Sequence, residues 1–169
     1  MIEVITGSMF SGKSKELKRR LEREVYAKKK IIVFKPSIDT RTEHVSTHDG
    51  ETIKTISISK PEEILKYNAD VIGIDEVQFF DRSIIDVVKK LNNKKIIISG
   101  LDMDFMGNPF ETTILLMGIA DKVDKLKAVC VKCGNDANIS YKLTNSQERI
   151  DVGNMYEARC WKCYNKISD

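Results

Sequence analysis

Eight residues near the start of the chain could bind the phosphates of a nucleotide. They run from Gly7 to Ser14 and read GSMFSGKS. Gly7 and Gly12 allow a tight turn and a close approach of the backbone to a phosphate, so that several N–H groups can point at the anion. Lys13 would contact the β- and γ-phosphates, and the Ser14 hydroxyl would be a ligand of Mg²⁺. The motif predicts binding of a nucleoside triphosphate; the alternative is a glycine turn that only begins a helix.

Asp75 and Glu76 supply two carboxylates directly after the apolar segment 71–74. An apolar strand that ends in acids, downstream of a phosphate loop, is typical of the strand that helps to hold Mg²⁺ in nucleotide-binding folds. Asp75 would hold the metal directly or through water, and Glu76 could accept a proton from a hydroxyl group or a water molecule. The alternative for this pair is an acidic cap of a following helix.

Asp39 and Arg41 place an acid and a base after a further apolar segment, 31–34. Ligands bind at the carboxyl ends of the strands in open α/β sheets, so both side chains are candidates for the same site. An ordinary polar turn explains them equally well. His44 and His48 follow in the next loop. We interpret them as polar loop residues, because no cysteine is near them in the sequence.

The four cysteines of the chain form two CxxC pairs that are separated by 26 residues. Two such pairs supply four thiolates, enough for a closed tetrahedral zinc site with no open position for catalysis. The gap is longer than the roughly 15–20 residues of typical zinc ribbons and leaves room for a hairpin and a loop. We expect structural zinc, with iron–sulfur ligation or redox-active pairs as alternatives. The ligands would be Cys130, Cys133, Cys160 and Cys163.

Length and composition limit the class of protein. A chain of 169 residues is long enough for one α/β domain with a small appendage. The formal charge of +3 is too small to indicate nucleic-acid binding, and the lysines and arginines are scattered. No segment approaches the roughly 18 apolar residues of a membrane span, and the start of the chain does not resemble a signal peptide. We therefore expect a cytoplasmic protein with no membrane partner.

The elements that must position these residues can be read from the spacing of apolar side chains. Unbroken apolar runs predict strands that are covered on both faces, and one alternating run predicts a half-buried strand. The predicted strands cover 2–5, 31–34, 52–58, 71–74 and 95–99, with a loop or hairpin tip at 42–51. Helices are predicted from the phosphate loop to near Lys29, from a capping box of Ser59 and Glu62 to Tyr67, from Asp81 through Leu91, and over 112–121.

Residues 100–110 form the exit loop of the last predicted strand and include a proline, two glycines and two phenylalanines. Aromatic and apolar side chains in such a loop, at the edge where ligands bind, indicate a pocket for a flat ligand. The alternative is that Phe105 and Phe110 only pin the loop to the core.

These motifs together resemble the zinc-containing (type II) thymidine kinases over essentially the whole chain. The resemblance implies a P-loop NTPase (RecA-like) core with a mainly parallel sheet in residues 1–125. It also implies a small zinc-ribbon domain in 126–169, which carries a lasso loop over the substrate. The implied activity is transfer of a phosphoryl group from Mg-ATP to the 5′-hydroxyl of thymidine, giving dTMP in deoxynucleoside salvage. The matching segments are GSMFSGKS, FKPSIDTR, IDEVQFF, GLDMDFMGNPF, CVKCG and YEARCWKC.

The resemblance also assigns roles to single residues. Glu76 would be the general base, with Lys13 and Arg41 neutralising charge on the phosphoryl group. Ser14 would hold Mg²⁺, with Asp39 and Asp75 directly or through water. ATP contacts would come from Gly7, Ser8, Met9, Phe10, Ser11, Gly12, Lys13, Ser14, Asp75, Glu76, Val77 and Gln78. Thymidine contacts would come from Met9, Leu101, Phe105, Phe110, Ser140, Ile150, Val152 and Tyr156.

Two departures from the family pattern concern the lasso and the phosphate loop. The lasso, at 144–155, is shorter than in many bacterial members, and Lys15 stands where a threonine is common. Ser14 already supplies the hydroxyl, so Lys15 should be tolerated. The family further suggests a homotetramer and feedback inhibition by dTTP, and it implies no nucleic-acid partner. The alternative function is a P-loop ATPase whose zinc ribbon acts on nucleic acid.

Overall fold

A mostly parallel β-sheet forms the centre of the computed structural model, which describes residues 1–39, 45–46, 52–144 and 155–165. Seven of the described strands form this sheet, in the order β3-β4-β2-β5-β6-β1-β7, and only β3 and β4 pair antiparallel. The elements of this part are β1 Ile2–Gly7, α1 Lys13–Tyr26, β2 Ile31–Pro36, β3 Val45–Ser46, β4 Thr52–Ile58, the 3-10 helix η1 Pro61–Lys66, β5 Val71–Ile74, the 3-10 turn η2 Val77–Phe79, α2 Ser83–Lys90, β6 Lys95–Gly100, α3 Glu111–Ile119 and β7 Lys122–Leu126. None of the described helices is long and apolar enough to cross a bilayer.

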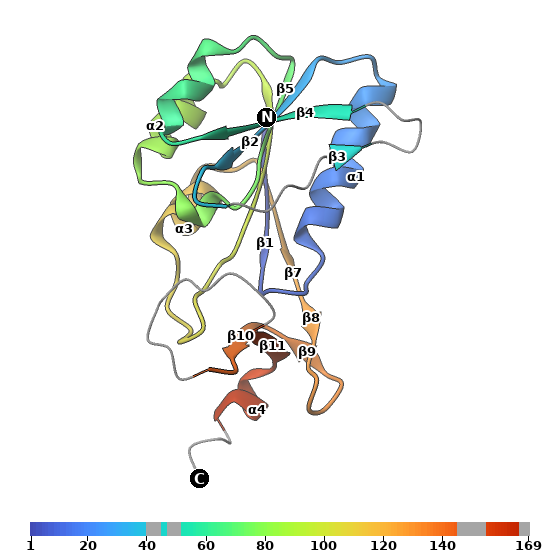
Figure 1. The fold of residues 1–169 in the computed structure, drawn as a ribbon, viewed down its shortest axis with the longest axis vertical. Coiled ribbons are helices and arrows are strands. Elements are labelled where there is room, and N and C mark those ends of the chain that lie inside the picture. Colours follow the sequence, from blue (N-terminus) through green and yellow to red (C-terminus); the bar gives the residue numbers. More distant parts are fainter. Residues whose placement is uncertain (40–44, 47–51, 145–154, 166–169) are drawn as a thin grey trace.

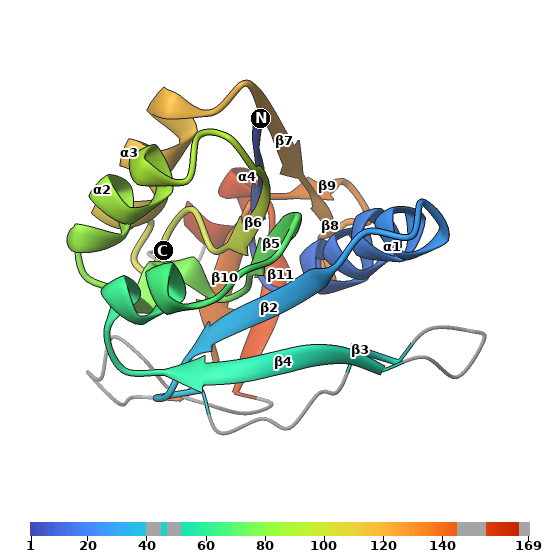
Figure 2. The same cartoon turned by 90° about the horizontal axis from the view of Figure 1, so that it is seen from above.

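Helices cover both faces of the sheet, with α1 on one side and α2 and α3 on the other (Figures 1 and 2). Successive residues of a strand point to opposite faces, so each buried strand contributes to two clusters. Leu17 and Leu21 of α1 pack with Ile5, Val33 and Ile97. The cluster on the other face includes Val4, Phe34, Ile72, Ile74, Ile98, Ile84, Val88 and Leu116. Each such side chain contributes about 2 kcal/mol when fully buried, which explains why unbroken apolar runs form these strands.

The strand order brings four loops to one edge of the sheet. β6 lies between β1 and β5, and β2 lies on the far side of β5. All of these pairs are parallel, with Thr6 opposite Gly100 and Ile74 opposite both Phe34 and Ile98. The segments that follow β1, β2, β5 and β6 therefore emerge side by side at the carboxyl edge, where ligands bind in sheets of this kind.

A smaller cysteine-containing part lies next to this edge (Figure 1). It consists of the hairpin β8 Ala128–Val129 and β9 Asp136–Ala137, the antiparallel pair β10 Ile139–Lys142 and β11 Tyr156–Arg159, and the short helix α4 Trp161–Asn165. We call residues 128–144 and 155–165 the ribbon. Cys130 and Cys133 lie on the turn between β8 and β9, and Cys160 and Cys163 lie at the start of α4.

The first helix ends earlier than predicted, at Tyr26 rather than near Lys29. Lys28 adopts a left-handed conformation with φ 56°. Its N–H group donates to the Val25 carbonyl at 2.7 Å, and the Lys29 N–H donates to the Glu24 carbonyl at 3.1 Å. This is the Schellman arrangement, which satisfies the last carbonyls of a helix and usually uses glycine at the left-handed position. The lysine run gave no sequence signal for this stop.

The predicted capping box of Ser59 and Glu62 was wrong by one position. The Glu63 carboxylate accepts the N–H groups of Ser59 at 3.1 Å and Lys60 at 3.0 Å. The helix begins at Pro61, whose fixed φ suits a first helical position, so that Glu63 becomes its third residue. The helix predicted from Asp81 begins at Ser83, with Arg82 as its N-cap residue, and the Asp81 side chain accepts the Ser83 N–H at 2.8 Å.

The end of the core also differs from prediction. The helix predicted over 112–121 covers Glu111–Ile119 instead, with Leu116 buried and Leu115 and Ile119 only partly buried. The strand β7 that follows was not predicted. Its residues, KVDKL, are mostly polar and partly exposed, because β7 is an edge strand that pairs only with β1.

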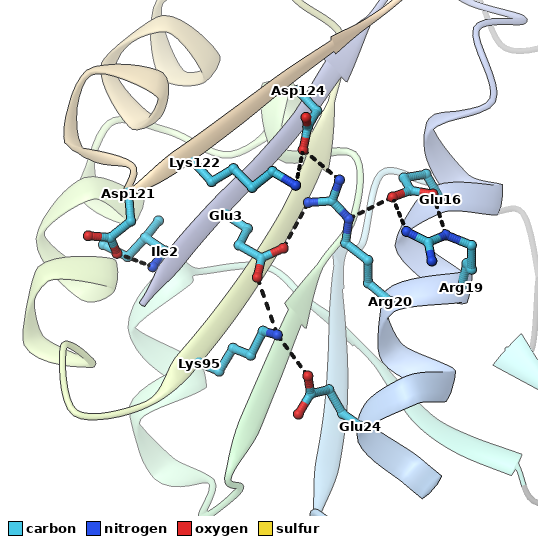
Figure 3. Close-up of polar contacts among 10 residues, drawn as sticks. All are labelled: Ile2, Glu3, Glu16, Arg19, Arg20, Glu24, Lys95, Asp121, Lys122 and Asp124. Carbon is cyan, nitrogen blue, oxygen red and sulfur yellow. Dashed lines mark hydrogen bonds and ion pairs between the residues drawn. The ribbon is translucent and has the colours of Figure 1, made fainter. Parts of the chain in front are cut away.

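A buried guanidinium joins this edge strand to the first helix (Figure 3). The side chain of Arg20, 9% exposed, contacts Glu3 of β1 at 2.8 Å, Glu16 of α1 at 2.8 Å and Asp124 of β7 at 2.6 Å. Lys95 of β6 contacts the other oxygen of Glu3 at 3.2 Å. One cation therefore fixes α1, β1 and β7 relative to one another.

Replacing Arg20 should destabilise the fold far more than replacing its neighbour. Arg20→Met would leave the buried Glu3 carboxylate with fewer partners, so we expect the free energy of unfolding to fall by about 3 kcal/mol. Arg19→Met is the matched control, because Arg19 is 57% exposed and, within the group of residues drawn in Figure 3, its side chain pairs with Glu16 alone; its effect should stay below about 1 kcal/mol. Urea unfolding of both variants tests this, and equal losses would contradict it.

Candidate active site

The loop after β1 folds around one of its own carbonyl groups. The Ser8 carbonyl accepts hydrogen bonds from Lys13 Nζ at 2.8 Å and from Ser11 Oγ at 2.7 Å. Gly7 has φ 141°, and a Cβ there would lie 2.2 Å from the Leu126 carbonyl oxygen, so no other residue fits. Ser14 is exposed in the first turn of α1. The loop thus has the strand–turn–helix geometry that a phosphate-binding motif requires.

Asp75 is a buried carboxyl group between two strands of the sheet. It follows β5, and its Oδ1 accepts hydrogen bonds from Ser99 Oγ of β6 and from the Glu76 N–H, the latter at 2.9 Å. Burial, and next the charge of Glu76, raises the pKa of Asp75 to about 6, whereas the hydrogen bonds and the charge of Lys13 act in the opposite direction. A cation beside it would keep it ionised. Carboxylate and hydroxyl oxygens are ligands that Mg²⁺ prefers, so Asp75 and Ser14 fit that role.

Glu76 has an unusual backbone and a well-defined side-chain partner. Its φ of 51° and ψ of 41° are left-handed, which costs roughly 1–2 kcal/mol for a residue with a Cβ. Its Oε2 accepts a hydrogen bond from Gln78 Nε2 at 2.5 Å, and Gln78 Oε1 accepts the Leu101 N–H at 3.0 Å. A Cβ on Gly100 would lie 2.7 Å from that Gln78 oxygen. Strained residues of this kind cluster at functional sites, and the buried Gln78 amide orients this one.

The other residues that were predicted to contact ATP, Mg²⁺ or the phosphoryl group have surroundings that say less about such a role. Val77 is fully buried in the core, so only its backbone could face a ligand. Phe10 is 61% exposed at the turn of the phosphate loop. Asp39 is buried after β2, with its Oδ2 3.9 Å from Lys35 Nζ. Arg41 lies outside the described residues.

The loop after β6 is built around an aspartate. Asp104 Oδ1 accepts the N–H groups of Met106 at 3.0 Å and Asn108 at 2.9 Å. Phe105 is the next residue, and its half-buried ring has Lys142 Nζ of β10 at 4.8 Å from its centroid. Leu101 is half-buried at the start of the loop, and Phe110 is buried at its end.

The ribbon contacts the phosphate loop directly. Ser140 Oγ of β10 accepts the Met9 N–H at 2.9 Å, and Ser8 Oγ donates to the Ala137 carbonyl at 3.4 Å. Tyr156 is buried in β11, opposite Lys142 of β10. The structure therefore brings Met9 and Ser140 together, as the predicted substrate site requires. Ile150 and Val152, and also His44 and His48, lie outside the described residues.

The four cysteines converge on one point. Their Sγ atoms all lie within 4.8 Å of one another, and the Sγ atoms of Cys133 and Cys160 are 3.6 Å apart. Ligands 2.3 Å from a tetrahedral zinc ion would be about 3.8 Å apart, so these residues could hold zinc. The pKa of Cys130 is lowered to about 6 by hydrogen bonds from the backbone N–H of Cys160 and then from those of Lys132 and Cys133. Hydrogen bonding to Cys133 and then Cys160 raises the pKa of Cys163 to about 12, and a bound cation would let all four ionise.

Fold and phosphate loop place the chain among the P-loop NTPase-like α/β proteins, which confirms the predicted fold class. Comparison with known families then gives a more specific result. The model of the thymidine kinase family matches residues 1–164, so the chain belongs to this family. This confirms the resemblance that the motifs indicated, and the family supports phosphorylation of thymidine.

Two solved structures of other proteins are similar to this chain. The flagellar accessory protein FlaH from Methanocaldococcus jannaschii has a TM-score of 0.52 and 13% identity, covering 94% of this chain and 86% of that chain. The Legionella pneumophila ATPase DotB has a TM-score of 0.49 and 16% identity, covering 80% of this chain and 42% of that chain. At this identity, the likeness to FlaH concerns the fold alone.

Several contacts of the site were not predicted. The sequence predicts Ser99 only as the end of a buried strand, although a single hydroxyl in an otherwise apolar run is a usable signal. The side-chain amide of Gln78, a residue expected to contact ATP, also joins Glu76 to Leu101. Lys142 gave no signal, since it meets Phe105 only after both chain segments have folded.

The buried acid should make stability depend on pH. Asp75 has its pKa raised from 3.8 to about 6, so the folded protein holds this proton more tightly than the unfolded chain. Its contribution to stability is therefore lost as pH rises through roughly 4 to 6, by about 3 kcal/mol at neutral pH. Asp75→Asn can still accept both hydrogen bonds, so its free energy of unfolding should exceed that of wild type by about 2–3 kcal/mol at pH 7.5 and by less at pH 4.5.

Denaturant unfolding at the two pH values, without Mg²⁺ or nucleotide, measures this difference. Asp86→Asn is the control, because Asp86 is exposed on α2. A gain for Asp75→Asn that does not change with pH would show that the carboxyl is not the cause.

The cysteine cluster should hold one metal ion that stabilises the fold. Titration with an organomercurial should release one zinc per chain after four thiols have reacted, as recorded with a colorimetric zinc indicator. Cys163→Ser removes one of the four ligands, so purified protein should contain much less zinc and unfold at a lower temperature. An iron chromophore, or a full zinc content in Cys163→Ser, would contradict a four-cysteine zinc site.

Proposed function

We propose that the protein transfers the γ-phosphoryl group of Mg-ATP to the 5′-hydroxyl of thymidine and so forms dTMP. This reaction would supply a precursor for DNA synthesis by deoxynucleoside salvage. The observation that carries the proposal is the placement of Glu76 beside Asp75 at the edge where the phosphate loop emerges. Family membership supports the nucleoside as acceptor.

Catalysis would rest on positioning and charge stabilisation, which dominate phosphoryl transfer. The N–H groups of the phosphate loop and Lys13 would hold the β- and γ-phosphates, and Arg41 would neutralise charge on the transferring group. Ser14, Asp39 and Asp75 would hold Mg²⁺, which supplies charge neutralisation between the phosphates when bound. Glu76, oriented by Gln78, would accept the proton of the 5′-hydroxyl.

The thymine base would lie between the phosphate loop, the loop after β6 and the ribbon. The Met9–Ser140 hydrogen bond and the half-buried Phe105 ring support this location, because they bring an apolar wall and polar groups to one place. The residues proposed to bind thymidine are Met9, Leu101, Phe105, Phe110, Ser140, Ile150, Val152 and Tyr156.

Further proposals concern the organisation of the chain. Residues 1–125 would form the ATP-binding domain and 126–169 the zinc-binding domain, since the described strands β8–β11 pair only with one another. A homotetramer and inhibition by dTTP are proposed from the family.

The reaction is tested with γ-labelled ATP and a panel of free nucleosides. Label should appear in the 5′-monophosphate of thymidine, require Mg²⁺ and not require nucleic acid. ATP hydrolysis that is stimulated by DNA, with no labelled nucleotide formed, would instead favour the nucleic-acid ATPase.

Removing the proposed base should reduce turnover without preventing nucleotide binding. Glu76→Gln keeps the side-chain shape but cannot accept the proton, so kcat should fall by roughly 100-fold or more, whereas ATP affinity measured by calorimetry should change little. Glu62→Gln, at an exposed position on η1, should retain full activity. Unchanged kcat in Glu76→Gln would eliminate Glu76 as the base.

A further inference from the structure

The second cysteine pair of the ribbon is linked to the loop after β6 through a tyrosine. Tyr164 follows Cys163 directly and lies in α4. Its hydroxyl donates a hydrogen bond to the Phe105 carbonyl at 3.1 Å, across 59 residues of sequence. The backbone of this turn is itself held, because the Cys160 carbonyl accepts the N–H groups of Cys163 at 3.1 Å and Tyr164 at 2.9 Å. The tyrosine is thus a direct connection from the metal ligands to the Phe105 backbone.

A second contact between the same two segments lies beside this hydrogen bond. Gly107 has φ 80°, and a Cβ there would lie 2.9 Å from the Cη2 atom of Trp161. The rings of Trp161 and Tyr164 meet edge to face, with centroids 5.9 Å apart, and Tyr141 approaches Tyr164 at 6.2 Å. Aromatic packing therefore holds the Tyr164 ring and places its hydroxyl at the turn.

The side chain of Phe105 is held from another part of the ribbon. The Lys142 ammonium lies over its ring at 4.8 Å, as in a cation–π contact. Asp104 fixes the shape of the turn by accepting the N–H groups of Met106 and Asn108. The contacts made by Tyr164, Trp161 and Lys142 thus join this loop to the ribbon.

We propose that Tyr164 is a positioning residue for thymidine binding. By holding the Phe105 carbonyl, it fixes the loop that presents the Phe105 ring to the base, and it makes this wall of the pocket depend on the Cys160–Cys163 turn. The inference rests on the proposed function, in which Phe105 contacts thymine. The hydrogen bond and ring contacts of Tyr164 are made with the Phe105 loop and with the ribbon, so its effect should fall on the nucleoside rather than on ATP.

The zinc-loaded variant Tyr164→Phe tests this, because it removes the hydroxyl and keeps the ring. Loss of one hydrogen bond that orients the loop should raise the KM for thymidine by roughly 3–10-fold, with kcat and the KM for ATP within about twofold. Zinc content and melting temperature should match those of wild type. Tyr141→Phe is the matched control, since its ring belongs to the same aromatic group, and its KM should not change.

A double-mutant cycle tests whether Tyr164 acts through Phe105. Phe105→Ala removes the ring that the loop presents, so adding Tyr164→Phe to it should raise the KM no further. Additive effects would overturn the proposal, and so would an unchanged KM in Tyr164→Phe or a rise accompanied by loss of zinc. If wild type phosphorylates thymidine and Tyr164→Phe is normal, only this inference fails; if wild type phosphorylates no nucleoside, the proposed function fails.

Discussion

The parallel hydrogen bonding of β6 to both β1 and β5 decides where the chemistry of this protein can occur. Because the three strands run in the same direction, the phosphate loop, the acidic pair and the Phe105 loop all begin at one edge. The Ser99 hydroxyl reaches Asp75 only because β5 and β6 are neighbours. The Gln78 amide likewise reaches Leu101, because Gln78 follows β5 and Leu101 follows the neighbouring strand β6. Backbone pairing thus sets the distances between groups that are far apart in sequence.

The site is assembled from features that oppose folding. A carboxyl group is buried at Asp75, and a left-handed backbone is held at Glu76. The surrounding sheet offsets these costs with isoleucine and valine packed on both faces, and Arg20 holds the far side of β1. Such a division between a stabilising core and a costly site is expected where groups are held in position before a ligand binds. The stable part of the fold and the reactive part share the same strands, because Ile74 and Ile98 of the core stand directly before Asp75 and Ser99.

Local patterns in the sequence were enough to predict the buried strands of the sheet centre. The run 52–58 was predicted with its observed ends. Its apolar residues pack on both faces and not on one, with Ile53 in the cluster beside α1 and Ile58 in the cluster on the other side. The prediction of secondary structure failed where an element forms through contacts with segments that are distant in the sequence. β7 has no apolar pattern and exists through its pairing with β1, and Glu63 replaced Glu62 because Pro61 fixes the first turn. The contacts of Ser140 with Met9 and of Tyr164 with Phe105 join segments 131 and 59 residues apart, which no local pattern encodes.

The joint between the sheet and the ribbon has a steric consequence of its own. Only Lys127 separates the last residue of β7 from the first of β8, and the Leu126 carbonyl occupies the space that a side chain at Gly7 would need. The ribbon is therefore a stiff extension of the sheet rather than a tethered module. The number of residues between β7 and β8 is therefore constrained more tightly than the type of residue at position 127. An inserted residue would shift the cysteine cluster relative to the Leu126 carbonyl that packs against Gly7 of the phosphate loop. Most substitutions of the exposed Lys127 would disturb neither group.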